Sequence, residues 1–138
     1  PVIEKSIYKV FEKQELVKNK KQIDKNIINK EFLVVDARSR SRFNGEEPEP
    51  RKGLRSGSIP NSLCLPFKEC INEDHTFKKK KELLTKFKSI LGDVLIENVV
   101  FSCGSGVTAS VLALAYSLIN NKYVPTIYDG SWSEYGKL

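Results

Sequence analysis

The sequence predicts an α/β domain in which a mainly parallel central sheet is flanked by helices. Two short apolar runs, at 32–35 and 98–101, have the length and continuous hydrophobicity of strands buried on both faces. Two longer segments are typical of helices, one amphipathic at 79–91 and one strongly apolar at 108–120. Strands that alternate with helices along a chain usually form a parallel sheet, because each return to the same edge needs a crossover connection.

The length of 138 residues fits a single domain that spans residues 1–138. Its hydrophobic content of 40% is ordinary for a globular protein and is enough for a real core. No apolar run approaches the roughly 18 residues that cross a bilayer, so we expect no membrane association. The chain opens with Pro1 and lacks the apolar stretch of a secretory signal, and we expect its true N-terminus to be missing.

The formal net charge is +6, and much of the excess lies in two lysine-rich runs at 18–21 and 78–81. Neither run has the interleaved aromatic residues or clustered arginines that would favour a nucleic-acid surface. We therefore interpret both runs as solvated surface and expect no nucleic-acid partner. A basic domain would still attract small anionic substrates.

The three cysteines, Cys64, Cys70 and Cys103, cannot all pair with one another. Their odd number and sparse usage argue against the disulfide framework of a small secreted domain. No pair has CxxC spacing, and the one histidine, His75, has no cysteine close by in sequence, so we expect no metal site. Cys64 and Cys70 lie at expected strand or helix positions, where burial is the default.

The first part of the chain is expected to run from a helix through a strand into a long loop. The helix is predicted over 5–22, where apolar residues recur at roughly helical spacing. The strand at 32–35 ends at Asp36, and a short helical turn is expected at 39–44. From 45 to 60 the chain is rich in Gly, Pro and charge, which predicts an ordered loop. A loop this long in a compact domain is usually functional.

The rest of the chain alternates between short strands and helices. Pro66 stops one strand, and Gly92 ends the amphipathic helix. The expected elements are strands at 63–65, 98–101 and 126–128 and helices at 67–71, 79–91 and 108–120, with a small-residue turn at 102–107.

Cys103 stands in the turn between a buried strand and a buried helix. Ligand sites in open α/β sheets lie at the carboxyl ends of the strands. Gly104 and Gly106 let the backbone turn tightly and aim several N–H groups into one concavity, and the following helix adds its positive N-terminal end. This cradle would stabilise a thiolate, a persulfide anion or a bound oxyanion, which suits covalent group transfer. The alternative is a buried, inert cysteine beside a structural glycine turn.

Three familiar motifs do not fit this turn. It lacks the Gly-Lys-Ser/Thr ending of a P-loop. Its two glycines are not followed by the third glycine and the ribose-binding acid of a dinucleotide site. A tyrosine-phosphatase loop, Cys-x5-Arg, would need arginine where Ala109 stands, and without it a phosphate loses its bidentate partner.

Three other groups of residues, spread along the chain, match a known pattern. They are CGSGVTA at 103–109, then VDAR at 35–38 with RFNGEEPEPR at 42–51 and GSIP at 57–60, and finally YDGSWSEY at 128–135. In order and approximate spacing they closely resemble the second rhodanese domain of the 3-mercaptopyruvate and thiosulfate sulfurtransferases. The match covers nearly the whole chain from residue 32 onward. It implies a rhodanese-like fold and the catalytic C-terminal half of a tandem two-domain protein.

The resemblance implies that Cys103 carries sulfur as a persulfide. The six-residue loop from Cys103 to Thr108 has the sulfurtransferase length, whereas the related cell-cycle phosphatases use a loop one residue longer. Thiosulfate enzymes of the family place cationic side chains just after the cysteine, where this chain has Gly104 and Ser105. We therefore expect 3-mercaptopyruvate as sulfur donor, with thiosulfate as the alternative. Cyanide, a small thiol or thioredoxin would accept the sulfur, and no metal or organic cofactor is expected.

The resemblance also assigns substrate contacts. Arginines that match Arg42 and Arg51 hold the carboxylate and keto oxygen of mercaptopyruvate, which suits a planar guanidinium that stays charged. The alternative for each is an ion pair with one of the nearby acids, Glu46, Glu47 or Glu49.

Other residues receive supporting roles. Ser105 would polarise the substrate carbonyl or relay a proton, unless it is a plain turn serine. Asp36 and Arg38 are expected to be structural partners, and Trp132 to pack in the core. The backbone N–H groups of the loop would stabilise the anionic sulfur, which makes Gly104, Gly106, Val107 and Thr108 candidate binding residues.

Ser58 departs from the family pattern. It stands where the family usually has histidine, which affects any hydrogen bond made there but not the cysteine chemistry.

The resemblance also implies a partner domain. In tandem proteins the first domain supplies part of the pocket, so an N-terminal rhodanese domain is an expected partner. A protein-fed sulfur relay is a further alternative, although the intact Arg42 and Arg51 argue against it. A cytoplasmic or mitochondrial location is expected.

Overall fold

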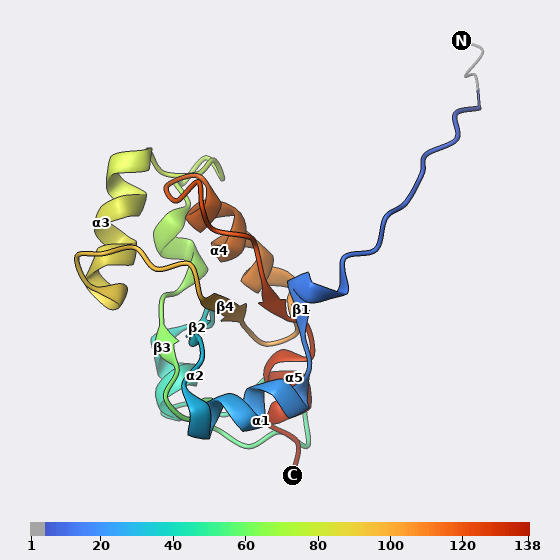
Figure 1. The fold of residues 1–138 in the computed structure, drawn as a ribbon. Coiled ribbons are helices and arrows are strands. Elements are labelled where there is room, and N and C mark those ends of the chain that lie inside the picture. Colours follow the sequence, from blue (N-terminus) through green and yellow to red (C-terminus); the bar gives the residue numbers. More distant parts are fainter. Residues whose placement is uncertain (1–4) are drawn as a thin grey trace.

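The computed structural model describes residues 5–138, and these residues are organised around one five-stranded sheet (Figure 1). Residues 1–4 of the predicted domain lie outside the described residues. The strands are β1 (Val17–Lys18), β2 (Leu33–Asp36), β3 (Leu63–Cys64), β4 (Val99–Ser102) and β5 (Ile127–Tyr128), in the order β1-β5-β4-β2-β3. Every pair of neighbouring strands runs parallel, which confirms the predicted fold class.

Helices cover both faces of the sheet and enclose two apolar cores (Figure 1). They are α1 (Lys20–Asn29), α2 (Arg40–Asn44), α3 (Lys80–Leu91), α4 (Val107–Ser117) and α5 (Ser131–Tyr135), with 3-10 turns η1 (Gln14–Leu16) and η2 (Phe67–Cys70). Helices α3 and α4 pack with Val35 and Val99 in one core. Helices α1 and α5 pack with Val34 and Val100 in the other, because successive strand residues point to opposite faces. None of the helices in residues 5–138 is long and apolar enough to cross a bilayer.

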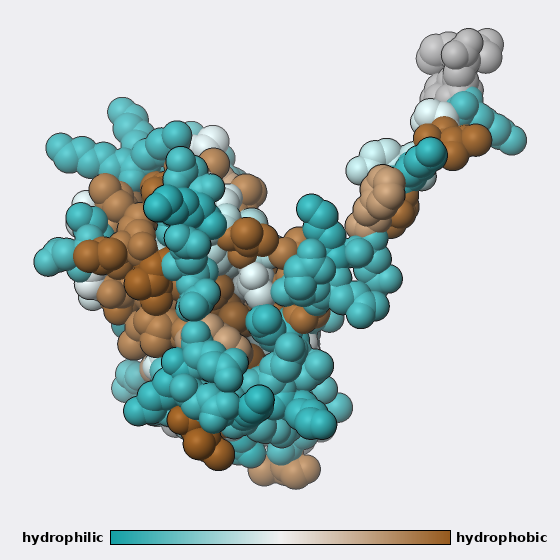
Figure 2. Space-filling view, in the orientation of Figure 1, coloured by the Kyte–Doolittle hydropathy of each residue, from teal (hydrophilic) through white to brown (hydrophobic). Residues whose placement is uncertain are grey.

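The N-terminal segment differs from the helix predicted over 5–22. Residues 5–13 form no regular element and extend away from the body, and Figure 2 shows brown, hydrophobic side chains along this arm. Ile7 and Phe11 are 96% and 80% exposed. The prediction was wrong because helical spacing of apolar residues stabilises a helix only where a partner covers the apolar face.

The first helix of the body begins later, at a capping signal. The Asn19 side chain accepts a hydrogen bond from the Gln22 N–H, and the Gln22 side chain accepts one from the Asn19 N–H. The residues just before it, Val17 and Lys18, pair with β5 as an edge strand instead of continuing a helix.

The remaining predicted elements are confirmed, with boundaries that shift by a few residues at most. The segment 45–60 forms no helix and no strand beyond an isolated bridge between Leu54 and Lys137. Helix α5 was not predicted. Asp36 and Ser102 are register partners at the ends of β2 and β4, so the chain leaves both strands at the same edge of the sheet.

Candidate active site

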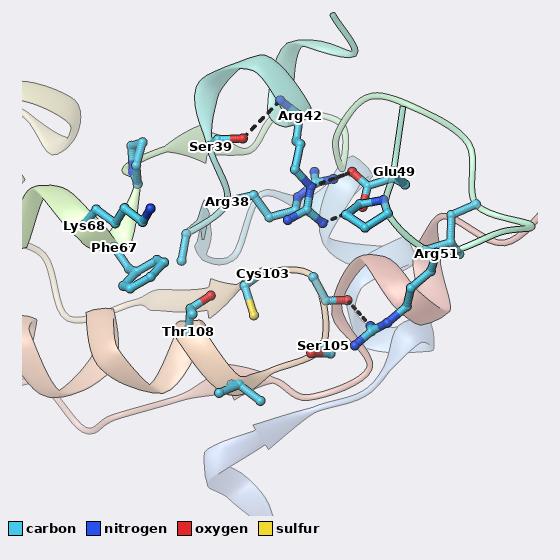
Figure 3. Close-up of a pocket in the computed structure, with 16 residues that line it drawn as sticks. Arg38, Ser39, Arg42, Glu49, Arg51, Phe67, Lys68, Cys103, Ser105 and Thr108 are labelled. Carbon is cyan, nitrogen blue, oxygen red and sulfur yellow. Dashed lines mark hydrogen bonds and ion pairs between the residues drawn. The ribbon is translucent and has the colours of Figure 1, made fainter. Parts of the chain in front are cut away.

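A cavity of about 440 Å³ lies at the carboxyl ends of β2 and β4 (Figure 3). Its walls come from the residues between β2 and α2, from the long loop at 49–54, from η2, and from the turn before α4. Among the predicted site residues, those that line it are Arg42, Arg51, Cys103, Gly104, Ser105, Val107 and Thr108. Gly106 does not line it.

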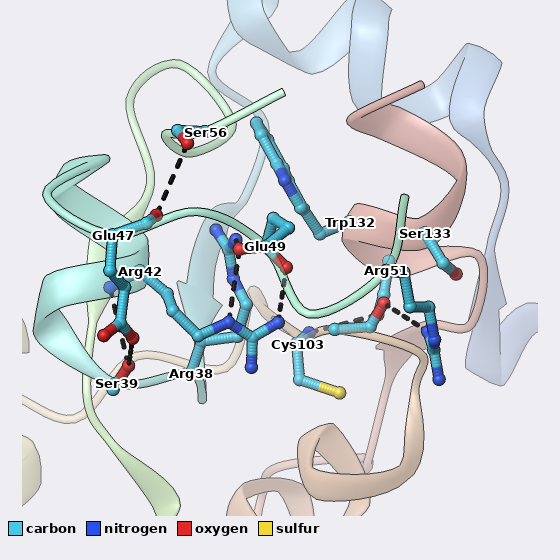
Figure 4. Close-up of polar contacts among 12 residues, drawn as sticks. Arg38, Ser39, Arg42, Glu47, Glu49, Arg51, Ser56, Cys103, Trp132 and Ser133 are labelled. Carbon is cyan, nitrogen blue, oxygen red and sulfur yellow. Dashed lines mark hydrogen bonds and ion pairs between the residues drawn. The ribbon is translucent and has the colours of Figure 1, made fainter. Parts of the chain in front are cut away.

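Cys103 directly follows β4 and is 2% exposed. Helix α5 holds its backbone from behind, because the Cys103 N–H donates to Ser131 Oγ at 3.0 Å and the Trp132 N–H donates to the Cys103 carbonyl at 2.9 Å. The Ser133 N–H donates to the Gly104 carbonyl at 2.9 Å. Three successive residues of α5 therefore hold the backbone of the Cys103 turn, and Figure 4 shows two of them, Trp132 and Ser133, with Cys103.

Gly106 is needed for the backbone conformation of the turn. It adopts φ +84° as the residue before α4, and a Cβ there would lie 2.9 Å from the Asp129 carbonyl oxygen. The turn can approach the chain after β5 only with glycine at this position. Gly104 faces the other way, and a Cβ on it would lie 3.2 Å from Arg42 Nη2, which places that guanidinium beside the cysteine.

A chain of ion pairs surrounds Glu49, which sequence reasoning considered only as a surface partner. Its carboxylate, on a side chain 2% exposed, accepts from Arg42 Nη2 at 2.5 Å and from Arg38 Nη1 at 2.8 Å (Figure 4). Arg38 in turn pairs with the buried Asp36 at 2.7 Å, which agrees with the structural role expected for both residues. Arg42 is therefore already bound to a carboxylate.

The electrostatics of the Arg42–Glu49 pair favour the charged forms of both side chains. Burial on its own would raise the pKa of Glu49, but the hydrogen bond from Arg42 and the charges of Arg38 and Arg42 outweigh it, so the pKa is lowered. The hydrogen bond to Glu49 raises the pKa of Arg42. Arg42 and Glu49 therefore stay ionised near neutral pH.

Arg51 is the less constrained of the two predicted arginines. It is exposed on the long loop, and its Nη1 donates to the Gly104 carbonyl at 3.5 Å (Figure 3). Among residues 5–138 no acid forms an ion pair with it. Its charge is available to an anion in the cavity.

The first turn of α4 and η2 complete the walls. Ser105, Val107 and Thr108 line the cavity on the side of α4. Phe67 and Lys68, two residues that the sequence did not single out, line it from η2 (Figure 3). No local pattern points to them, since they reach the site through the parallel pairing of β3 with β2.

The other two cysteines, Cys64 and Cys70, lie away from the cavity that Cys103 lines. Burial raises the pKa of the Cys64 thiol and of the Cys70 thiol to about 11 in each case. Neither residue lines the cavity. Both are therefore neutral thiols near pH 7, and Cys103 is the cysteine that a bound molecule would meet.

Comparison with known proteins identifies close relatives of this sequence. A family model described as a rhodanese-like domain matches residues 19–138. The chain is 40% identical over 119 residues to the 3-mercaptopyruvate sulfurtransferase of Homo sapiens, an overlap of 86% of this chain and 39% of that protein. It is 38% identical over 133 residues to the thiosulfate sulfurtransferase of Bos taurus, covering 96% of this chain and 44% of that protein. The chain thus spans less than half the length of these relatives.

Solved structures show the same fold. Tum1 from Saccharomyces cerevisiae superposes with a TM-score of 0.75 at 30% identity, over 88% of this chain and 44% of that one. SseA from Escherichia coli, whose structure is described as that of a 3-mercaptopyruvate sulfotransferase, gives a TM-score of 0.68 at 34% identity with the same coverage. From the family match, these identities and the shared parallel sheet, it follows that the chain belongs to the rhodanese family.

Proposed function

We propose that this chain is the catalytic domain of a sulfurtransferase that takes sulfur from 3-mercaptopyruvate onto Cys103. The observation that carries the proposal is the placement of Cys103 before α4, in a small cavity whose other walls present arginine side chains. Relatives about 40% identical bear the name of this activity, which supports the same reaction class.

The first half-reaction would be an attack of the Cys103 thiolate on the sulfur of the donor. An S–S bond forms and the C–S bond breaks, and its electron pair stays on carbon as the enolate of pyruvate. The enolate takes up a proton and leaves as pyruvate, while Cys103 keeps the transferred sulfur as a persulfide. In the second half-reaction a nucleophilic acceptor attacks the outer sulfur, and Cys103 is released as a thiolate.

The residues around Cys103 would bind the donor and stabilise the charges that form during the reaction. Arg51 would bind the donor carboxylate. Arg42 uses Nε and Nη2 for Glu49, and its Nη1, which has no partner among residues 5–138, would donate to the keto oxygen. Ser105 would polarise that carbonyl or relay the proton. The backbone N–H groups at 104–108 would stabilise the anionic sulfur.

The donor choice rests on the residues after the cysteine. Gly104 and Ser105 add no charge to the turn, which favours a donor with one carboxylate over the thiosulfate dianion. Thiosulfate remains the second candidate, because relatives named thiosulfate sulfurtransferase match 96% of this chain. Cyanide, a small thiol or thioredoxin would accept the sulfur.

The domain would work beside a second domain in the whole protein. This chain covers 39% of the human relative and 44% of the bovine one, so each has a further region of at least the size of this domain. We infer that a preceding rhodanese domain closes the cavity, and that the protein acts in the cytoplasm or in mitochondria.

The test is the intact mass of the protein after brief exposure to 3-mercaptopyruvate, with Cys103→Ser as control. A gain of one sulfur atom that cyanide removes, and that the control lacks, is the expected result. The same gain in Cys103→Ser would disprove the role of Cys103. A parallel incubation uses thiosulfate. A mass gain with thiosulfate but not with mercaptopyruvate would identify thiosulfate as the donor and would still support a persulfide on Cys103.

A further inference from the structure

Some cationic side chains that line the cavity form ion pairs with acids, and others form none. Arg38 and Arg42 are balanced by Asp36 and Glu49 through the ion pairs described above. Arg51 and Lys68 make no ion pair within residues 5–138, although both line the cavity. Because paired charges largely cancel at a distance, an anion entering the cavity meets the uncompensated charge of Arg51 and Lys68.

These two cations approach Cys103 from different sides. In Figure 3, Lys68 extends from η2 on one side of Cys103 with its amino group pointing into the cavity, and Arg51 lies on the other side of the cysteine. Arg51 belongs to the long loop before β3, and Lys68 belongs to η2 after β3. An anion in front of the thiol would therefore lie between them.

The position of Lys68 is set by the fold. The Phe67 N–H donates to the Ala37 carbonyl at 3.1 Å, and Cys70 at the end of η2 is fully buried in the core under α4. The neighbouring acid, Glu69, is already paired with Arg40 at 2.7 Å and with Lys86 at 3.2 Å. It therefore leaves the charge of Lys68 available to the cavity.

We propose that Lys68 is a specificity-determining residue that, with Arg51, holds a donor carrying two negative charges, so that this domain accepts thiosulfate as well as 3-mercaptopyruvate. The proposal rests on Cys103 as the sulfur carrier. Two cations on separate walls match the charge of a dianion, whereas the single carboxylate of mercaptopyruvate needs only one of them. Lys68 thus supplies from η2 a charge that Gly104 and Ser105 do not supply.

The thiosulfate reaction places both charges between these walls throughout. The Cys103 thiolate attacks the outer sulfur, a new S–S bond forms, and the S–S bond within thiosulfate breaks. Its electron pair leaves on sulfite, which carries two negative charges, while Cys103 retains the persulfide. Lys68 therefore contacts the donor and the leaving group alike, and its loss is expected to raise KM with little effect on kcat.

The first experiment compares kcat/KM for both donors in the wild-type chain, Lys68→Gln, Lys68→Arg and Lys52→Gln. Lys52 is a matched control, since it is an exposed lysine beside Arg51 that does not line the cavity. Lys68→Gln should lower kcat/KM about tenfold for thiosulfate and about threefold or less for mercaptopyruvate, and high salt should narrow the difference. Lys68→Arg should restore most of the loss. Equal losses for both donors, or an equal loss in Lys52→Gln, would overturn the proposal.

A binding measurement separates this inference from the proposed function. In the Cys103→Ser chain, which cannot form a persulfide, thiosulfate affinity is measured by calorimetry with Lys68 and with Gln in its place. Weaker binding without Lys68 supports the inference even if the wild-type chain transfers no sulfur. Unchanged binding refutes the inference even if the wild-type chain is active.

Discussion

Glu49 determines how the two predicted arginines differ. Both were expected to bind a carboxylate of the substrate, yet Arg42 already has a carboxylate partner at 2.5 Å inside the protein. Arg51 has none among the residues described. The sequence identified Glu49 as one of three nearby acids, and the tertiary contact with Arg38 distinguishes it, because that contact draws the carboxylate into the interior.

We expect Glu49 to contribute to the acid dependence of the free energy of unfolding. Its pKa is lowered from 4.5 in the folded chain, so the unfolded chain binds the proton more readily. The contribution to the free energy of unfolding is fully present above about pH 4.5 and is lost as the pH falls through the folded pKa. Glu49→Gln should remove this part of the acid dependence and cost about 3 kcal/mol near pH 7, because Arg38 and Arg42 lose a buried partner.

Urea unfolding between about pH 3 and pH 7 measures both effects. Glu47→Gln is the control, since Glu47 is an exposed acid in the same loop and, among residues 5–138, its carboxylate accepts a hydrogen bond only from Ser39. It should change the free energy of unfolding by less than about 0.5 kcal/mol. Equal dependence of the unfolding free energy on pH in the two variants would show that Glu49 contributes no more than Glu47 to acid stability.

At the scale of elements, the short helix α5 supports the site without lining it. Ser131 is fully buried, adopts φ +49°, accepts from the Cys103 N–H and donates to the Tyr128 carbonyl at 2.8 Å. Trp132 is 1% exposed, as its predicted core position requires, and its ring lies 4.6 Å from the Arg38 guanidinium. One helical turn thus ties the cysteine, the end of β5 and the ion-pair cluster together.

Ser131→Ala should therefore weaken both the fold and the reaction. Removing Oγ leaves the buried Cys103 N–H without an acceptor, which costs about 1–3 kcal/mol and loosens the turn that positions the thiol. Thermal unfolding and the rate of sulfur loading check the two effects. Ser133→Ala is the matched control, because the Ser133 hydroxyl donates to the Gly130 carbonyl and not to the Cys103 turn, while the backbone N–H still donates to the Gly104 carbonyl. An equal loss of loading rate in the control would assign the effect to α5 in general.

At the scale of the whole molecule, the packed body begins near β1 and α1. Ile23 of α1 is fully buried in the core beside α5, whereas Ile7, Val10 and Phe11 are between 79% and 96% exposed. The arm at 5–13 carries apolar residues at helical spacing but has no surface of residues 5–138 to cover them.

Replacing Ile7, Val10 and Phe11 together with serine should leave the stability of the body almost unchanged, within about 0.5 kcal/mol. Ile23→Ala should cost about 2–5 kcal/mol, because it leaves a cavity in the core. Chemical unfolding of the two variants makes the comparison. A large loss in the serine variant would mean that the arm packs against the body in solution.

The sequence by itself determined the fold class and the place of Cys103 in the turn between a buried strand and a buried helix. Continuous apolar strands, alternating helices and a glycine-rich turn are local patterns, and they identify β2, β4, α3, α4 and the Cys103 turn because each depends on residues close in the chain. Tertiary structure decided which apolar segment has a partner, which acid pairs with Arg42, and which side chains of η2 line the cavity. Those outcomes depend on how separate segments fold and pack against one another, so no local periodicity or motif encodes them.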